Sequence, residues 1–114
     1  MLTVQALKEH GADVEDGLTR CMNNEAFYIR LVGMALNDGA YESLGEAIKA
    51  GDTRAAFEEA HKLKGMLANL SLTPVLDPVS QLTEILRNDS EGDREGLYAQ
   101  LMQQRDALKA LVNG

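Results

Sequence analysis

The sequence predicts an all-α protein, an antiparallel up-down four-helix bundle with one or two short additional helices at its N-terminal end. Apolar residues recur three and four positions apart, which is the spacing of amphipathic helices. Strict alternation of apolar and polar residues, the signature of a half-buried strand, is missing. With 114 residues we expect a single domain over 1–114, with short helices over about 1–22 and the bundle over about 24–113.

The N-terminal region divides into three expected helices. The first covers about 4–11, and Asp13 caps a second helix whose first turn is acidic. Asn23 or Asn24 then caps a third helix, which the Asn-Asp-Gly turn at 37–39 ends. The residues of this third helix that we expect to face inward are Phe27, Tyr28, Leu31, Val32, Ala35 and Leu36.

A tight turn joins the next two expected helices. One covers about 40–50 and ends at Gly51. Asp52 caps its successor, over about 53–70, and so short a connection makes the two helices antiparallel. The residues that the first of these helices should bury are Tyr41, Leu44, Ala47 and Ile48.

The start of the following helix is ambiguous because two cap-proline pairs precede it. Thr73-Pro74 and Asp77-Pro78 both place a capping residue before a proline at the first helical position, and a kink at Pro78 would reconcile them. This helix runs to about residue 87, and a polar loop leads to the last helix, over about 93–112. The apolar stripe of the last helix consists of Leu97, Leu101, Leu108 and Leu111.

Composition excludes several classes of function. The net charge of −7 comes from 18 acidic and 11 basic residues without a basic block, and aromatic residues are few, so we expect no nucleic-acid partner. The single cysteine, Cys21, allows neither an intramolecular disulfide nor a cysteine metal cluster. No phosphate-binding glycine loop is present, so we predict that the protein is not an enzyme such as a kinase. Without a membrane-length apolar run or a signal-peptide pattern, we expect a cytoplasmic protein with no membrane partner.

The helix over 53–70 carries His61 near its middle. On a helical wheel, five of its apolar residues fall within an arc of roughly 80°. These residues are Ala56, Ala60, Leu63, Leu67 and Leu70. His61 lies about 140° from the centre of that arc. The imidazole should therefore point away from the core.

Two neighbours of His61, Lys64 and Gly65, indicate a chemical role for this histidine. Gly65 lies mid-helix, where glycine costs about 1 kcal/mol relative to alanine, so a packing or functional reason is expected. With no side chain at Gly65 and only a methyl group at Ala68, another protein could approach the imidazole closely. Lys64 would stabilise a phosphoryl group on the ring nitrogen through its charge. Neutral imidazole is a suitable nucleophile for such a group near pH 7.

Each of these residues alone has a less specific explanation. A surface histidine is usually a solvated side chain, and we interpret His10, beside Gly11, as solvated or as capping the end of a helix. The arrangement of His61 with Lys64 and Gly65 is more specific than its parts. The methionines and leucine stripes are expected in the core rather than around a cofactor.

The run Ala60-His61-Lys62-Leu63-Lys64-Gly65, followed by Asn69-Leu70, resembles the histidine-containing phosphotransfer (HPt) domain family of two-component phosphorelays. Segments 11–18 and 24–28 and the pair at 51–52 are also similar to family members. The resemblance implies a four-helix bundle with the histidine exposed mid-helix. It also implies that His61 takes a phosphoryl group from the aspartate of a receiver domain and passes it to another receiver.

The resemblance further implies roles for neighbouring residues. Lys64 and Gly65 match the family's lysine and glycine, whereas Ala68 and Ser71 stand where many members have glycine. Many members also carry Glu or Gln on the adjacent helix to hold the other imidazole nitrogen. The candidates for that role here are Gln81, Thr83 and Glu84.

Partners and cofactors also follow from the resemblance. The partners would be receiver domains of response regulators or of a hybrid sensor kinase. Magnesium would belong to the receiver, so we expect no cofactor or metal of this chain's own. We expect a monomer. The main alternative is a helical adaptor that binds receivers or a sensor kinase without carrying phosphate.

Overall fold

The computed structural model describes residues 2–113 and, within that range, contains seven α-helices and no strand. The all-α prediction is therefore confirmed. The helices are α1 (Val4–Glu9), α2 (Val14–Arg20), α3 (Glu25–Leu36), α4 (Ala40–Ala50), α5 (Thr53–Asn69), α6 (Thr73–Arg87) and α7 (Arg94–Asn113).

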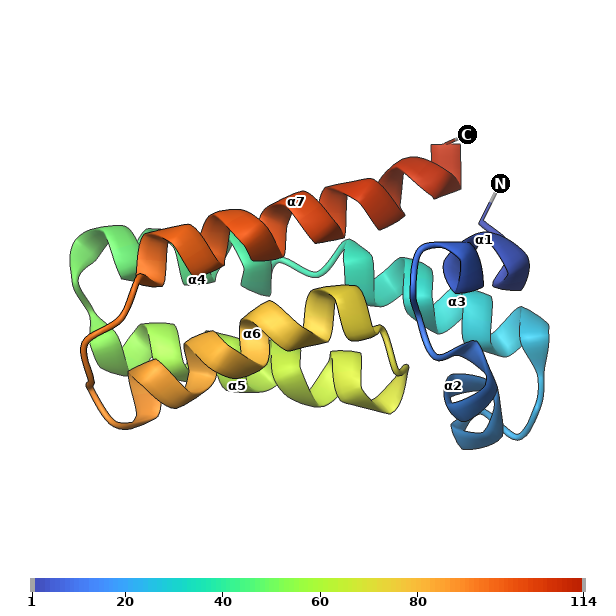
Figure 1. Cartoon of the computed structure of the whole chain (residues 1–114), viewed down its shortest axis with the longest axis horizontal. Helices are drawn as coiled ribbons and strands as arrows, with labels where there is room; N and C mark the ends of the chain where they lie inside the picture. The colour runs from blue at the N-terminus through green and yellow to red at the C-terminus, as the bar shows by residue number, and fades with distance from the viewer. Residues whose placement is uncertain (1, 114) are drawn as a thin grey trace.

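The bundle has four antiparallel members, one of which is made of two helices. Figure 1 shows α3 and α4 following one another along the long axis, after which α5 returns, α6 runs back and α7 returns again. α5 packs against both α4 and α6, and α7 covers α6. The short helices α1 and α2 lie at one end of the bundle, beside the start of α3 (Figure 1). The up-down arrangement that the short loops predicted is present.

Three of the expected capping residues begin helices as predicted. Asp13, Asn24 and Asp52 each accept a hydrogen bond from the amide three residues further on, at 3.0 to 3.2 Å. Of the two asparagines that could cap α3, it is therefore Asn24 that does so. Gly51 ends α4 with φ +73°, a left-handed conformation that glycine adopts without strain.

Two details of the predicted helices are wrong. The N-cap of α6 is Leu72, not Thr73, and Pro74 is the second residue of a helix that continues through the buried Pro78. One cap-proline pair thus starts α6 and the other lies inside it. Phe27, which we expected to face inward, is 41% exposed, whereas Tyr28 beside it is fully buried. α3 has apolar residues on more than one side, so the pattern did not define a single inner face.

The far end of α5 is held by the N-terminal helices. The hydroxyl of Tyr28 donates to the carbonyl of Leu70 at 2.8 Å, and the amide of Asp13 donates to the carbonyl of Ser71 at 3.0 Å. The hydroxyl of Ser71 donates to the carboxylate of Asp16, and this bond, with a second from Arg20, lowers the pKa of Asp16. These bonds fix the turn that sets α6 beside α5.

Arg105 of α7 secures the junction between α3 and α4. Its side chain is buried, and its guanidinium lies 4.9 Å from the ring centroid of Tyr41. It also donates to the carbonyl of Leu36, the last residue of α3, at 3.3 Å. A carbonyl that the helix end leaves without an internal partner is thereby satisfied.

Candidate functional site

His61 lies near the middle of α5 and its side chain is exposed. The buried residues of this segment are Ala56, Ala60, Leu63, Leu67 and Leu70. They are the five residues that the helical wheel assigned to the core. Their burial fixes the rotation of α5 about its axis, so His61 faces outward as predicted.

The imidazole of His61 stacks on the ring of Phe57, one turn earlier in α5. The two ring centroids are 5.6 Å apart and the planes are inclined by 27°. On α6, the central carbon of the Arg87 guanidinium lies 5.6 Å from the centroid of the same Phe57 ring. Within residues 2–113 the structure records no hydrogen bond to either ring nitrogen of His61. The ring of Phe57 therefore contacts the imidazole of a residue that is exposed as a whole.

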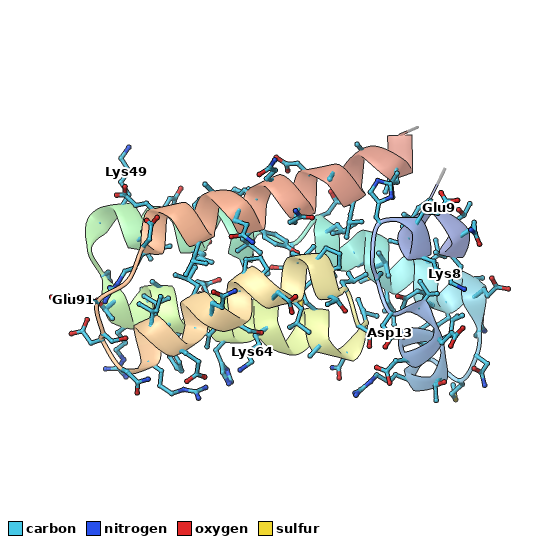
Figure 2. All side chains as sticks on the ribbon, viewed as in Figure 1. Lys8, Glu9, Asp13, Lys49, Lys64 and Glu91 are labelled. Carbon is cyan, nitrogen blue, oxygen red and sulfur yellow. The ribbon has the colours of Figure 1, made fainter. Side chains whose placement is uncertain are left out.

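A charged cluster lies between α5 and α6 beside this stack. The Nζ atom of Lys64 is 3.8 Å from Oε1 of Glu84, and Nη1 of Arg87 is 2.9 Å from the same oxygen. The three side chains are between 35% and 51% exposed. Figure 2 shows Lys64 along the edge formed by α5 and α6, on the side away from α7. One carboxylate thus holds two cations next to the histidine helix.

Gly65 leaves open space beside His61. A Cβ atom built on Gly65 would meet nothing within 4 Å, so packing inside the described chain does not require glycine there. Ala68, one turn further on, is half-buried. Ser71 lies beyond the end of α5 and turns inward to Asp16, so it is not part of the histidine face. The accessible surface along α5 consequently extends from His61 over Gly65 toward Ala68.

The three candidates for holding the imidazole have different environments. Thr83 is fully buried and its hydroxyl donates to the carbonyl of Val79 at 2.6 Å, so the idea that it orients the ring is wrong. Glu84 is exposed on the α5 side, but its carboxylate binds Lys64 and Arg87. Gln81 is exposed, and no bond between it and His61 is recorded in the described chain.

A different surface flanks α5 on its α3 side. There an open apolar groove is lined by Leu31, Met34, Ala35, Asp38, Met66, Asn69 and Leu70. Lys62 spans its end, with Nζ 3.5 Å from Oδ1 of Asp38. Met34 is 61% exposed. The histidine face is therefore bordered by charged residues toward α6 and by apolar residues toward α3.

His10 has the capping role that was one of its two expected explanations. It is the C-cap residue of α1, and its Nδ1 lies 3.0 Å from the carbonyl oxygen of Ala6. A carbonyl only accepts, so the ring donates in this contact. One histidine of the chain thus completes a helix end, and the other has no such structural task.

Sequence reasoning missed Arg87, whose guanidinium lies over Phe57 beside the histidine. The position of Phe57, one turn before His61, makes it a neighbour of the histidine from the sequence alone. Arg87 belongs to another helix. Counting back from the tight turn between α5 and α6 would have placed residues 84 and 87 opposite the first half of α5, where Phe57 lies, because antiparallel neighbours pair in reverse order.

The arrangement of these residues defines a class of protein. A helical bundle that exposes an imidazole mid-helix, beside a lysine and an open glycine, offers a nucleophile to a reactive group on another macromolecule. The chain belongs to the Hpt domain family, because the family profile described as "Hpt domain" matches residues 37–114, well over half of the chain. Helices α1 to α3 precede the matched region. Hpt domains are phosphocarriers that transfer phosphoryl groups on histidine in phosphorelays and interact with receiver domains.

Neither the curated proteins nor the solved structures gave a match. Over residues 2–113, no helix combines the length and the apolar character needed to cross a membrane. Nor does that part of the chain gather three or more His, Cys, Asp or Glu side chains that could hold a metal ion.

Proposed function

We propose that this protein accepts a phosphoryl group on His61 from the aspartyl phosphate of a receiver domain and passes it to the aspartate of another receiver. The observation that carries the proposal is the exposed imidazole with Lys64 one turn away and open space at Gly65. Membership of the Hpt family supports the same reaction.

The proposed transfer is a displacement at phosphorus. A lone pair of the His61 imidazole attacks, the bond from phosphorus to the aspartyl oxygen breaks, and its electrons return to the carboxylate. The ring carries an extra positive charge until its other nitrogen releases a proton to solvent. Lys64 offsets the negative charge of the phosphoryl group, and the Phe57 contact keeps the ring turned outward. Return transfer to a second receiver reverses these steps.

The open surface beside the ring supports a partner that is a protein and brings its own chemistry. The open surface over Gly65 and Ala68 gives another domain room to approach the ring. Magnesium would be held by the acidic site of the receiver, where it offsets phosphoryl charge. We propose receiver domains of response regulators or of a hybrid sensor kinase as these partners, with the chain acting as a monomer in the cytoplasm.

A labelling experiment tests the proposal. A receiver charged with radioactive acetyl phosphate in the presence of magnesium should label the wild-type chain, and His61→Gln should abolish that label. His10→Gln is the matched control, because the chain has two histidines and His10 occupies a helix end. The label should be lost in acid and kept in alkali, as a phosphoramidate requires. Label that survives acid, or that persists in His61→Gln, would contradict the proposal. Absence of any label on the wild-type chain would favour an adaptor that does not carry phosphate.

A further inference from the structure

Two cations beside the His61 stack, Lys64 and Arg87, share a single anion. Oε1 of Glu84 lies 2.9 Å from Nη1 of Arg87 and 3.8 Å from Nζ of Lys64. Arg87 in turn lies over Phe57, whose other contact is the imidazole of His61. The carboxylate of Glu84 therefore stands where it neutralises the charges that a phosphoryl group on His61 would need.

A phosphoryl group is the stronger ligand for these cations. It carries about 1.5 to 2 negative charges near pH 7 and has three acceptor oxygens, whereas a carboxylate has one charge and two oxygens. The Lys64 and Glu84 side chains are 35% and 51% exposed, so their pair is weak and easily exchanged. Arg87 and Glu84 are three residues apart on one helix, so the carboxylate stays within reach of Arg87 when a phosphoryl group also attracts it.

We infer that Glu84 is a positioning residue that competes with the phosphoryl group for Lys64 and Arg87. Without phosphate on His61, it keeps both cations beside the histidine. Once His61 is phosphorylated, the negative charge of Glu84 repels the phosphoryl group and attracts Lys64 and Arg87 away from it. Both effects lower the stability of phosphohistidine and favour transfer to the next receiver. This role differs from holding the imidazole, and it rests on the proposed function of His61.

The test compares Glu84→Gln with Glu58→Gln. Glu58 is also an exposed carboxylate near His61 on α5, but its recorded partner is Arg54, at 3.6 Å, so its removal gives the same change in net charge without touching the cluster. Each protein is equilibrated with a phosphorylated receiver, and the ratio of phosphohistidine to aspartyl phosphate is measured. The half-life of phosphohistidine in the isolated protein is measured as well.

Glu84→Gln should move the equilibrium toward phosphohistidine by about fivefold, the upper range for an exposed charge pair. Glu58→Gln should change it by less than about twofold. The difference between the equilibrium shifts of the two variants should shrink in about 1 M salt, because salt screens exposed charges. Salt would not affect a purely structural role of Glu84. Circular dichroism and the thermal midpoint should be unchanged by either substitution.

Each other result rejects the inference. Equal effects of the two substitutions would show that only net charge matters, and a shift away from phosphohistidine in Glu84→Gln would show that the carboxylate assembles the cations rather than competing for them. Absence of label on His61 in the wild type would contradict the proposed function together with this inference. Normal labelling of the wild type with an unchanged equilibrium in Glu84→Gln would contradict the inference alone.

Discussion

Gly45 in α4 and Gly65 in α5 both lie inside a helix, where glycine destabilises by about 1 kcal/mol relative to alanine. Their surroundings differ. A Cβ on Gly45 would lie 2.5 Å from Cζ of Tyr98, whose hydroxyl donates to the carbonyl of Tyr41 at 2.9 Å. A Cβ on Gly65 would meet nothing within 4 Å. The packing of α4 against α7 thus explains why residue 45 is glycine. No packing contact within the described chain explains the glycine at position 65.

Two further glycines, Gly17 and Gly33, have surroundings like those of Gly45 and Gly65. Gly17 resembles Gly45, because a Cβ there would lie 2.5 Å from Cε1 of Tyr28 and 2.7 Å from the carbonyl oxygen of Leu70. Gly33 in α3 resembles Gly65 and also has open space around it. Open space alone therefore does not indicate function. What distinguishes Gly65 is its place one turn from the exposed His61.

The largest expected effect is that of Gly65→Gln on phosphoryl transfer. A long side chain beside the imidazole would hold a receiver away from it, and misplacement of reacting groups by about 1 Å already costs on the order of a hundredfold in rate. We therefore expect transfer to slow by about a hundredfold while circular dichroism shows an intact bundle. Single-turnover transfer from a labelled receiver measures the rate.

Gly33→Gln is the matched control for this substitution. It places the same side chain at an open helical glycine outside the histidine helix, so transfer should stay close to the wild-type rate. Equal slowing in both variants would mean that a change in the helices, rather than blocked access, causes the loss. An unchanged rate in Gly65→Gln would contradict the role in access that we give to Gly65.

The next largest effect is that of Gly45→Ala on stability. The added methyl group forces Tyr98 to move and breaks its hydrogen bond to Tyr41, so we expect a loss of about 2 kcal/mol in the free energy of unfolding. Urea denaturation measures the loss. Repeating the substitution in a Tyr98→Ala background should remove most of the cost, because the ring that obstructs the methyl group is gone. An equal cost in both backgrounds would exclude Tyr98 as the obstacle.

The parts of this molecule that could be predicted from the sequence depend on local patterns. The capping residues Asp13, Asn24 and Asp52 act within their own helices, and amphipathic spacing in α5 defines a single inner face. The outward direction of His61 follows from that face. α3 has no comparable single inner face, which is why Phe27 was assigned to the wrong side.

The residues that could not be predicted depend on contacts between helices. Thr83 and Glu84 are adjacent in sequence, and a difference of about 100° around α6 sends one into the core and the other to the surface. The apolar stripe of α6 separates these two by itself, because its buried members Val75, Val79, Leu82 and Leu86 lie near Thr83 and opposite Glu84. The contacts between helices are different. The contact of Arg87 with Phe57 requires the register of α6 on α5, and the obstruction of Gly45 requires the path of α7 across α4. None of these is encoded in the spacing of a single helix.

The smallest expected effect is that of Gly65→Ala on stability. Alanine fits the open space there and is the better helix former, so Gly65→Ala should increase the free energy of unfolding by about 1 kcal/mol. The corresponding rise in the thermal midpoint is roughly 4 °C for a domain of this size. Gly33→Ala should stabilise α3 by a similar amount, and only Gly65→Ala should also slow transfer, by less than Gly65→Gln because a methyl group is short. If Gly65→Ala failed to stabilise the protein while Gly33→Ala did, glycine would be required by the shape of α5 itself. Gain in stability with loss of transfer at Gly65 alone would instead show that the chain forgoes about 1 kcal/mol there to keep the imidazole accessible.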